Sequence, residues 1–155
     1  MITFFGPGGT GKSTYVENKY PVADGNFWLT IRKGRDRLWW DNYKGEKTVV
    51  IDEFEGQVPQ VEMKRILDSK PYHLERKGGT VAALYTKVVL VSNHHPFDWY
   101  KRGMEEPLVH RIFGQEGRKG QVFSYFSKEE GPQPTTIDDA SRFRGRDWGE
   151  SHHGQ

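Results

Sequence analysis

The sequence predicts an α/β fold in which a central, mostly parallel sheet is flanked by helices and carries a phosphate-binding loop. The loop is Gly6-Pro7-Gly8-Gly9-Thr10-Gly11-Lys12-Ser13, which fits the spacing G-x-x-x-x-G-K-[ST] without a mismatch. An apolar run over 1–5 precedes it and a helix is expected over 14–20, so the motif has the strand and helix that it requires. Two further runs, 48–51 and 87–91, are rich in β-branched and apolar residues without alternation. This pattern is typical of strands buried on both faces of a parallel sheet.

The remaining elements follow from local patterns of apolar, glycine and proline residues. Further strands are expected over 26–30 and 121–126, and helical segments over 61–67 and 99–112. Pro59 is placed to begin the first of these helices and Pro71 to end it. Gly103 and Pro107 are expected to break the turns of the second.

Three segments raise the question of nucleic-acid contact. Residues 72–76 and 81–85 predict a hairpin around Lys77-Gly78-Gly79-Thr80, which places a lysine at its tip. The basic segment 32–37 fits a solvated loop and a phosphate contact equally well. The adjacent Trp39 and Trp40 have the rings to stack on bases, but packing is the favoured interpretation.

Length and composition indicate one domain over 1–127 and a polar tail over 128–155, which has too few apolar residues to order itself. The net charge is +4 over the domain (19 Lys and Arg against 15 Asp and Glu) and −2 over the tail, which mildly favours a polyanionic partner for the domain. The chain has no cysteine and its histidine pairs lack metal-site spacing. We also expect no membrane contact, because no apolar run has membrane-spanning length and no secretory signal is present.

The glycine-rich motif predicts a site for a nucleoside triphosphate. Its backbone N–H groups turn inward on the phosphate chain, and the following helix adds partial positive charge. The expected binding residues are Gly6, Pro7, Gly8, Gly9, Thr10, Gly11, Lys12, Ser13 and Thr14. Lys12 is expected to reach the β- and γ-phosphates, and the Ser13 hydroxyl to bind Mg²⁺.

Polar side chains at the ends of two predicted strands indicate hydrolysis. Asp52 and Glu53 follow the run over 48–51, where adjacent carboxylates are costly unless a cation or a reaction uses them. We expect Asp52 to hold Mg²⁺ through water, Glu53 to polarise the attacking water, and Asn93 to orient that water. A small-molecule kinase uses the same loop but transfers phosphate to a hydroxyl, and it stays open as an alternative.

Hydrolysis also needs positive charge near the departing γ-phosphate, usually from an arginine of a neighbouring subunit. Arg111 is the first choice for this role, and Arg102 and Arg118 remain open. The competing interpretation of Arg111 is a surface residue paired with Glu105 or Glu106.

Taken together, the motifs closely resemble the superfamily 3 helicase domain of the replication-initiator (Rep) proteins of circoviruses, cycloviruses and related small circular single-stranded-DNA viruses. The resemblance covers about residues 2–126. It rests on Gly6 to Ser13, Trp39-Trp40-Asp41-Asn42-Tyr43-x-Gly45, Val49-Val50-Ile51-Asp52-Glu53-Phe54-x-Gly56, Lys77-Gly78-Gly79-Thr80 and Val89-Leu90-Val91-Ser92-Asn93. It implies an AAA+ fold that works as a hexameric ring, with ATP and Mg²⁺ bound between subunits and single-stranded DNA threaded through the centre. It also implies a helicase of viral rolling-circle genome replication in the host cell nucleus.

Carried over residue by residue, the resemblance assigns Gly6 to Ser13 to the Walker A motif and Asp52-Glu53 to the Walker B pair. Lys77, with Gly78 and Gly79, falls in the motif that contacts DNA in the pore. Asn93 matches the sensor of motif C, and Arg111 matches the arginine finger.

The sequence also departs from this family. Rep proteins of this kind carry an N-terminal endonuclease domain and a short helical segment, and both are missing before the first predicted strand. We therefore expect either a fragment or a helicase-only product, without nicking activity. The superfamily 3 helicase of an RNA virus shares the motifs and is the alternative, although the Trp-Trp-Asp-Asn-Tyr and Lys-Gly-Gly-Thr stretches favour the DNA-virus branch.

Overall fold

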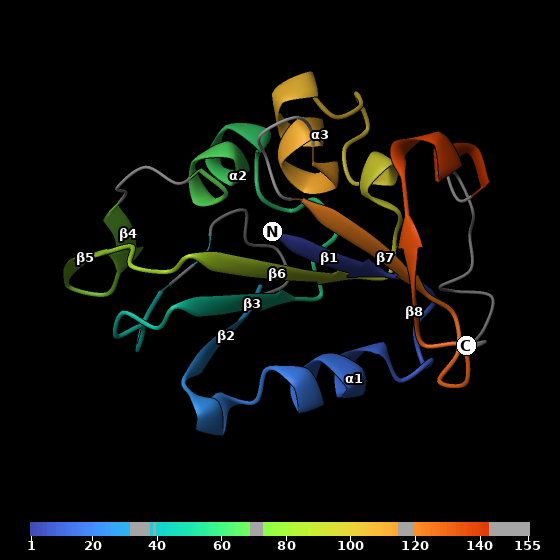
Figure 1. Ribbon diagram of the computed structural model, residues 1–155. Coiled ribbons are helices and arrows are strands. Elements are labelled where there is room, and N and C mark those ends of the chain that lie inside the picture. The colour runs from blue at the N-terminus through green and yellow to red at the C-terminus, as the bar shows by residue number, and fades with distance from the viewer. Residues whose placement is uncertain (32–37, 39, 69–72, 115–119, 143–155) are drawn as a thin grey trace.

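The computed structural model describes residues 1–31, 38, 40–68, 73–114 and 120–142. It contains a six-stranded sheet with the order β2-β3-β6-β1-β7-β8, and a separate hairpin of β4 and β5 (Figure 1). The strands are β1 (Ile2–Phe5), β2 (Asn26–Thr30), β3 (Thr48–Asp52), β4 (His73–Arg76), β5 (Gly79–Ala82), β6 (Lys87–Ser92), β7 (Gln121–Tyr125) and β8 (Pro132–Thr135). Every pairing in the large sheet is parallel except that of β7 with β8. The predicted α/β class with a mostly parallel sheet is confirmed.

Helices cover both faces of the large sheet (Figure 1). The helix α1 (Lys12–Lys19) lies on one face, and α2 (Gln60–Ile66) and α3 (Glu106–Phe113) lie on the other. Three short 3-10 helices, η1 (Val22–Asp24), η2 (Pro96–Asp98) and η3 (Ile137–Arg142), lie in the connections. Within the described part of the chain, each helix is too short or too polar to span a lipid bilayer.

The continuous apolar strands form a core on each face of the sheet because successive strand residues point to opposite sides. On the α1 side, the buried cluster consists of Phe4, Val16, Tyr20, Val50, Val89 and Val91. On the other side, alternate residues of the same strands, such as Phe5, Ile51 and Leu90, belong to a larger cluster. That cluster includes Met63 and Ile66 of α2 and Leu108 and Ile112 of α3. The sheet is therefore a rigid platform for whatever its ends carry.

The two ends of the parallel strands carry different features. Phe5 of β1 pairs with Ser92 of β6, so the loop that follows β1 lies beside Asn93. Ile51 of β3 pairs with Leu90 of β6, which brings Asp52 to the same edge. The β4–β5 hairpin precedes β6 and lies at the opposite end of the sheet (Figure 1). The fold thus separates the glycine-rich loop from the glycine hairpin.

Pro107 begins a helix, contrary to the prediction that it breaks one. It occupies the first turn of α3, where a proline loses no intrahelical hydrogen bond and its fixed φ suits the helix. The helical pattern over 99–112 began too early, because residues 99–105 connect η2, which ends at Asp98, to α3, which begins only at Glu106. Pro71, expected to end α2, lies outside the described residues.

The polar segment after residue 127, where a tail without order was expected, contains a strand and a 3-10 helix as far as Arg142. Pro132–Thr135 forms β8, which pairs antiparallel with β7 at the edge of the sheet. A hairpin partner is held by backbone hydrogen bonds and needs few apolar side chains, and Thr135 alone of this strand is buried. The part of the tail over 143–155 lies outside the described residues.

Trp40 packs in the core, as expected. It is 2% exposed and stacks against Tyr85 with 5.7 Å between ring centroids and against Phe27 with 6.0 Å. The predicted hairpin is also confirmed, although its return strand begins at Gly79 and leaves Lys77-Gly78 as the turn. Trp39 and the basic segment 32–37 lie outside the described residues.

Candidate nucleotide site

The glycine-rich loop joins β1 to α1 in a shape that only glycine permits at two positions. A Cβ on Gly6 would lie 1.9 Å from the carbonyl oxygen of Tyr125. Gly11 caps α1 with φ 91°, which lies in the left-handed region that glycine adopts at little cost. The Thr10 hydroxyl donates to the Pro7 carbonyl over 3.0 Å and closes the loop on itself. No side chain among the described residues caps α1, so its first N–H groups remain available to a phosphate.

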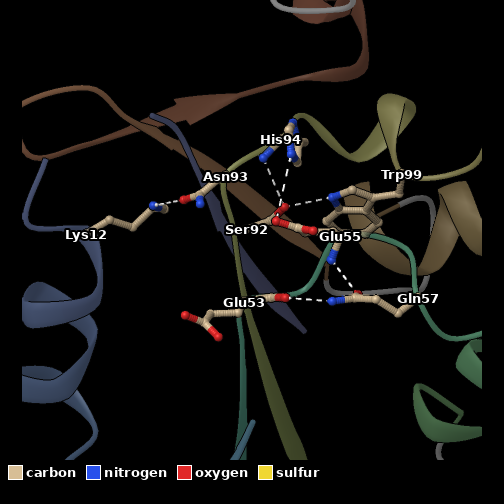
Figure 2. A network of polar contacts seen from close by, with 8 residues as sticks. All are labelled: Lys12, Glu53, Glu55, Gln57, Ser92, Asn93, His94 and Trp99. Atoms are coloured by element: carbon tan, nitrogen blue, oxygen red, sulfur yellow. Dashed lines mark hydrogen bonds and ion pairs between the residues drawn. The ribbon is translucent and has the colours of Figure 1, made fainter. Parts of the chain in front are cut away.

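Lys12 is a buried cation at the start of α1. It is 4% exposed, and its ammonium donates to the amide oxygen of Asn93 over 2.8 Å (Figure 2). Burial lowers the pKa of Lys12 from its ordinary value of 10.5 to about 8, and the negative charge of Asp52 partly opposes this shift. A buried ammonium that is hydrogen-bonded to a neutral amide is stabilised by an incoming anion. The side chain is therefore suited to hold a phosphate group.

The other residues of the motif lie around Lys12 as the pattern predicts. Ser13 is half-buried in the first turn of α1, and Thr14 next to it is exposed. Gly6 and Pro7 are buried at the base of the loop, whereas Gly9 is exposed at its tip. The loop can accordingly enclose a phosphate chain while its outer rim stays open.

Asp52 and Glu53 lie at the carboxyl end of β3, at the same end of the sheet as Lys12. One carboxylate oxygen of Asp52 accepts the backbone N–H of Glu53 over 2.9 Å. Glu53 has φ 55°, an unusual conformation for a residue with a side chain, and backbone strain of this kind clusters at functional sites. Its side chain is exposed, and Figure 2 shows it directed away from the loop that follows. Glu53 is therefore accessible to a water at this edge.

Gln57 holds the loop that carries Glu53, a role that no sequence pattern indicates. Its amide nitrogen donates to the Glu53 carbonyl over 2.9 Å, and its amide oxygen accepts the Glu55 N–H over 2.6 Å (Figure 2). One side chain thus replaces the backbone hydrogen bonds that a regular element would supply. Hydrogen bonds from Gln57, within the same loop, therefore stabilise the unusual φ of Glu53.

The hydroxyl of Ser92 holds the turn that contains Asn93. The buried Ser92 hydroxyl accepts the N–H of His94 over 3.0 Å and the indole N–H of Trp99 over 2.9 Å (Figure 2). His94 lies 4.0 Å from the Glu55 carboxylate, which links this loop to the one after β3. The amide of Asn93 therefore projects from a fixed turn.

The residues at this edge fit a Mg²⁺ ion that is shared with a nucleotide. No cluster of three or more His, Cys, Asp or Glu side chains suited to a metal occurs in the described ranges. Mg²⁺ is usually held by one or two protein oxygens together with substrate phosphates and water. The Ser13 hydroxyl and the half-buried Asp52 carboxylate are oxygen ligands of this kind. Both fit the ion as partial ligands, and neither forms a complete site alone.

Arg111 lies at the other end of the sheet from Lys12. A Cβ on Gly120, one residue before β7, would meet the Arg111 carbonyl at 2.7 Å, which places Arg111 near the amino ends of the parallel strands. Its guanidinium donates to the Pro107 carbonyl over 2.9 Å and lies 3.7 Å from the Asp68 carboxylate. Arg111 therefore lies away from the glycine-rich loop of its own chain.

The acidic residues that the sequence offered as partners of Arg111 pair elsewhere. Glu105 lies 2.6 Å from Lys64, and Glu106 lies 3.6 Å from His110. The prediction of a surface pair with either glutamate is therefore wrong in its partner, since the carboxylate near Arg111 belongs to Asp68. Arg102 is exposed, and Arg118 lies outside the described residues.

Lys77 is not part of the nucleotide site. It stands at the turn of the β4–β5 hairpin, and Lys77, Gly78 and Gly79 are all exposed. The two-residue turn needs a positive φ, which Gly78 supplies at 85°. The structure thus brings Lys12, Asp52, Glu53 and Asn93 to one edge and presents Lys77 at the other.

Known protein families contain sequences that match the part of the chain that forms this site. A family model described as RNA helicase matches residues 2–94, a stretch that contains the glycine-rich loop, both carboxylates and Asn93. The chain is 39% identical over 95 residues to the replication-associated protein of Porcine circovirus 2, covering 61% of this chain and 29% of that protein. It is 33% identical over 115 residues to the replication-associated protein of Goose circovirus, covering 74% and 37%. The chain therefore spans about a third of the length of these curated relatives, and the predicted resemblance is confirmed.

Among solved structures, the chain is similar to NtrX from Brucella abortus in complex with ATP. The TM-score is 0.50 at 18% sequence identity, over 81% of this chain and 32% of that one. At this identity the likeness concerns the fold alone, and it agrees with an α/β fold of the AAA+ P-loop type.

Proposed function

This chain belongs to the RNA helicase family, and we propose that it is the helicase portion of a viral replication protein that moves on single-stranded DNA by hydrolysing ATP. The observation that carries the proposal is the buried Lys12 ammonium, bound to Asn93 at the edge where Asp52 and Glu53 also stand. The relatives are replication-associated proteins of circoviruses. The family that the motifs resemble implies single-stranded DNA as the track and the nucleus of the host cell as the place of action. The proposal concerns this portion only.

The residues at the nucleotide edge divide the work of hydrolysis. Lys12 binds the β- and γ-phosphates, and their charge favours its protonated form. Asn93, released from Lys12, orients a water, and Glu53 takes the proton of that water. Ser13 and Asp52 would hold Mg²⁺, which when bound neutralises charge on the phosphate oxygens.

Efficient turnover requires a second copy of the chain. Arg111 lies at the far end of its own sheet, so it completes the nucleotide site of a neighbouring subunit. A closed ring, hexameric as in the family that the motifs resemble, satisfies this requirement for every subunit. In such a ring, hydrolysis in one subunit depends on contact with the next.

Movement on DNA requires that the nucleotide state reach the hairpin. β6 begins five residues after β5 ends, and its six residues lead directly to Asn93, a path of roughly 20 Å. The exposed Lys77 offers positive charge to a DNA phosphate at the start of this path. A shift of Asn93 on hydrolysis therefore displaces the tip that grips the strand.

ATP hydrolysis by the purified chain tests the proposal, measured with no nucleic acid, with oligo(dT) and with oligo(rU). We expect oligo(dT) to stimulate hydrolysis more than oligo(rU), and we expect Lys12→Ala to abolish both nucleotide binding and hydrolysis. Retained hydrolysis in clean Lys12→Ala protein would refute the site assignment.

Two other outcomes would replace the proposal. RNA is the second candidate track because the matching family is described as RNA helicase, and stronger stimulation by oligo(rU) would establish it. Turnover that ignores nucleic acid and needs a hydroxyl-bearing second substrate would indicate a kinase. Light scattering with ATP and oligo(dT) tests the ring, and a monomer under all conditions would exclude it.

A further inference from the structure

The loop over residues 40–46, here called the seat loop, has no role in the nucleotide site. It contains the Trp-Asp-Asn-Tyr stretch that the sequence singled out. One carboxylate oxygen of Asp41 accepts the backbone N–H of Lys77 over 2.6 Å, across 36 residues of sequence. An exposed loop that reaches the tip of the hairpin is unexpected if that tip is a free turn. The hydrogen bond therefore points to a role for the seat loop in holding the tip.

A second hydrogen bond ties the seat loop to the exit of the same hairpin. The Tyr43 hydroxyl accepts the N–H of Leu84 over 3.2 Å and donates to the Glu46 carbonyl over 2.8 Å. Tyr43 is 0% exposed, and its ring packs edge-on against Trp40 with 5.6 Å between centroids. The seat loop thus holds the hairpin at two points, and the second of them is part of the core.

The seat loop is itself braced, so it can act as a fixed reference. The N–H of Tyr43 donates to the Trp40 carbonyl over 3.0 Å, which closes a turn. Asn42 takes φ 72° in this turn, a conformation that asparagine tolerates better than most residues. The N–H of Lys44 donates to the Glu46 carboxylate over 2.7 Å. Asp41 is therefore presented from a loop of defined shape.

The hairpin needs such a reference because its own packing is confined to its base. Leu74 of β4 is 1% exposed and pairs with Val81 of β5, which packs against the core. Beyond this pair, residues 77–80 are all exposed. A two-stranded hairpin is marginally stable alone, and a charge-assisted hydrogen bond at the tip limits the directions in which Lys77 points.

The chemistry of Asp41 is consistent with positioning and opposes direct binding. A carboxylate beside a phosphate-binding lysine repels the phosphate, so its presence weakens binding unless it serves the geometry of the tip. The carboxylate accepts a hydrogen bond from the backbone N–H of Lys77. This hydrogen bond does not involve the side-chain ammonium of Lys77.

We propose that Asp41 is a positioning residue that aims the Lys77 tip at single-stranded nucleic acid. The inference rests on the proposed function, because it names how the same chain engages its track. The seat loop connects the hairpin to the core through Tyr43 and Trp40, so the tip is held in one direction without being packed. Removing the carboxylate oxygen frees the tip and weakens binding.

The test compares three variants by fluorescence anisotropy with labelled oligo(dT) and by hydrogen exchange at the Lys77 amide. Asp41→Ala removes the acceptor, Asp41→Asn keeps an acceptor oxygen without charge, and Asp138→Ala is a control at an exposed aspartate of η3. We expect Asp41→Ala to weaken binding about tenfold and to speed exchange at Lys77. We expect Asp41→Asn to stay within about threefold of the unmodified chain, and Asp138→Ala to change neither measurement.

Each possible result decides the inference. Tighter binding in both Asp41 variants would show that the carboxylate only repels the strand. Unchanged exchange at Lys77 in Asp41→Ala would show that the hydrogen bond does not hold the tip. If the unmodified chain fails to bind oligo(dT), the proposed function fails, yet the exchange measurement still decides whether Asp41 holds the tip. Hydrolysis without DNA is expected to stay unchanged in all three variants, and its loss would indicate misfolding rather than misdirection.

Discussion

The two ends of the central sheet hold their functional residues in different ways. At the nucleotide end, Lys12 is 4% exposed and bound to Asn93, and Gln57 fixes the loop of Glu53 by two hydrogen bonds. At the hairpin end, residues 77–80 are exposed, and the tip is tied to the rest of the fold by Asp41. The difference follows from the tasks that we propose for the two ends. Hydrolysis requires reacting groups at fixed positions, whereas a grip on a strand requires an exposed tip that a single hydrogen bond directs toward the strand.

The two ends of the sheet also differ in whether their lysine is buried. The ammonium of Lys12 loses hydration in the fold, which lowers its pKa and makes the empty site unfavourable for a cation. The ammonium of Lys77 stays in water, where it can contact a backbone phosphate whatever the base sequence of the strand. We therefore expect the nucleotide end to bind one ligand, and the hairpin end to contact the repeated phosphates of a strand.

Arg111→Ala gives the largest expected effect and tests whether the nucleotide end is complete within one chain. We expect kcat for ATP to fall about 10³-fold or more, because charge on the departing phosphate is no longer balanced. Arg102→Ala, at an exposed arginine, is the control and is expected to retain turnover. Mixing Arg111→Ala with Lys12→Ala is expected to recover part of the activity, since one intact site forms at a mixed interface. No recovery at any mixing ratio, with assembly verified, would argue against an arginine acting between subunits.

Glu53→Gln separates binding from chemistry at the nucleotide end. We expect ATP affinity to stay within a few-fold while turnover falls by about 10²- to 10⁴-fold, because an amide cannot take the proton of water. Glu55→Gln changes an exposed neighbour in the same loop and is expected to have little effect on either quantity. Stopped-flow binding and steady-state hydrolysis measure the two separately. Unchanged turnover in Glu53→Gln would remove Glu53 as the base.

The pH dependence of the unliganded protein tests the burial of Lys12 directly. Its pKa is about 8 in the folded state against 10.5 ordinarily, so the unfolded chain binds more protons between these pH values. The free energy of unfolding therefore contains a Lys12 contribution that rises with pH from about 8 to 10.5. In Lys12→Met this contribution is absent, so the difference between the two proteins isolates it. Parallel stability curves for the two proteins would contradict the shifted pKa.

The same shift predicts the pH dependence of nucleotide binding. Above pH 8 the ammonium of Lys12 loses its proton in the empty site, and phosphate binding must restore it. We expect the Kd for ATP to rise by up to about tenfold per pH unit above this point. Isothermal titration in buffers of different ionisation enthalpy measures the accompanying proton uptake. Binding at about one pH unit above the Lys12 pKa without proton uptake would contradict the account.

Lys77→Ala gives the smallest expected effect and tests the hairpin end. We expect oligo(dT) affinity to fall about tenfold at moderate salt, as much as in Asp41→Ala, whereas ATP binding is unchanged. The slope of log affinity against log salt is expected to become shallower by about 0.7 for each phosphate that Lys77 neutralises. Lys101→Ala removes another exposed lysine and is the control. An unchanged salt slope would show that Lys77 does not bind the strand.

The sequence predicted those parts of the molecule that depend on neighbouring residues. The run over 48–51, with its β-branched residues, specifies a buried strand locally, and the glycine spacing before Lys12 specifies the loop whatever surrounds it. Parallel pairing then brought Asp52 and Asn93 to one edge, as the order of strands implied. The prediction for Pro107 was wrong because a proline inside an apolar pattern can either end a helix or begin one, and only the start of the helix decides.

Contacts of side chains with backbone groups, and contacts between residues far apart in sequence, could not be predicted. Gln57 acts through two backbone groups, and Asp41 binds a backbone N–H 36 residues away, so no side-chain pattern marks either contact. Asp68 approaches Arg111 only because α2 and α3 pack side by side. The strand β8 was missed for the same reason, since its pairing depends on the exposed edge of β7 rather than on its own polar sequence.

We propose above all that the nucleotide state at one end of the sheet changes the grip on nucleic acid at the other end. The most direct measurement is the affinity of Glu53→Gln protein for oligo(dT) with saturating ATP, with ADP and without nucleotide. We predict that ATP and ADP give affinities that differ by at least about fivefold, as expected for two coupled sites, and that Lys77→Ala in the same background reduces the difference. Equal affinities in all three states would contradict the account.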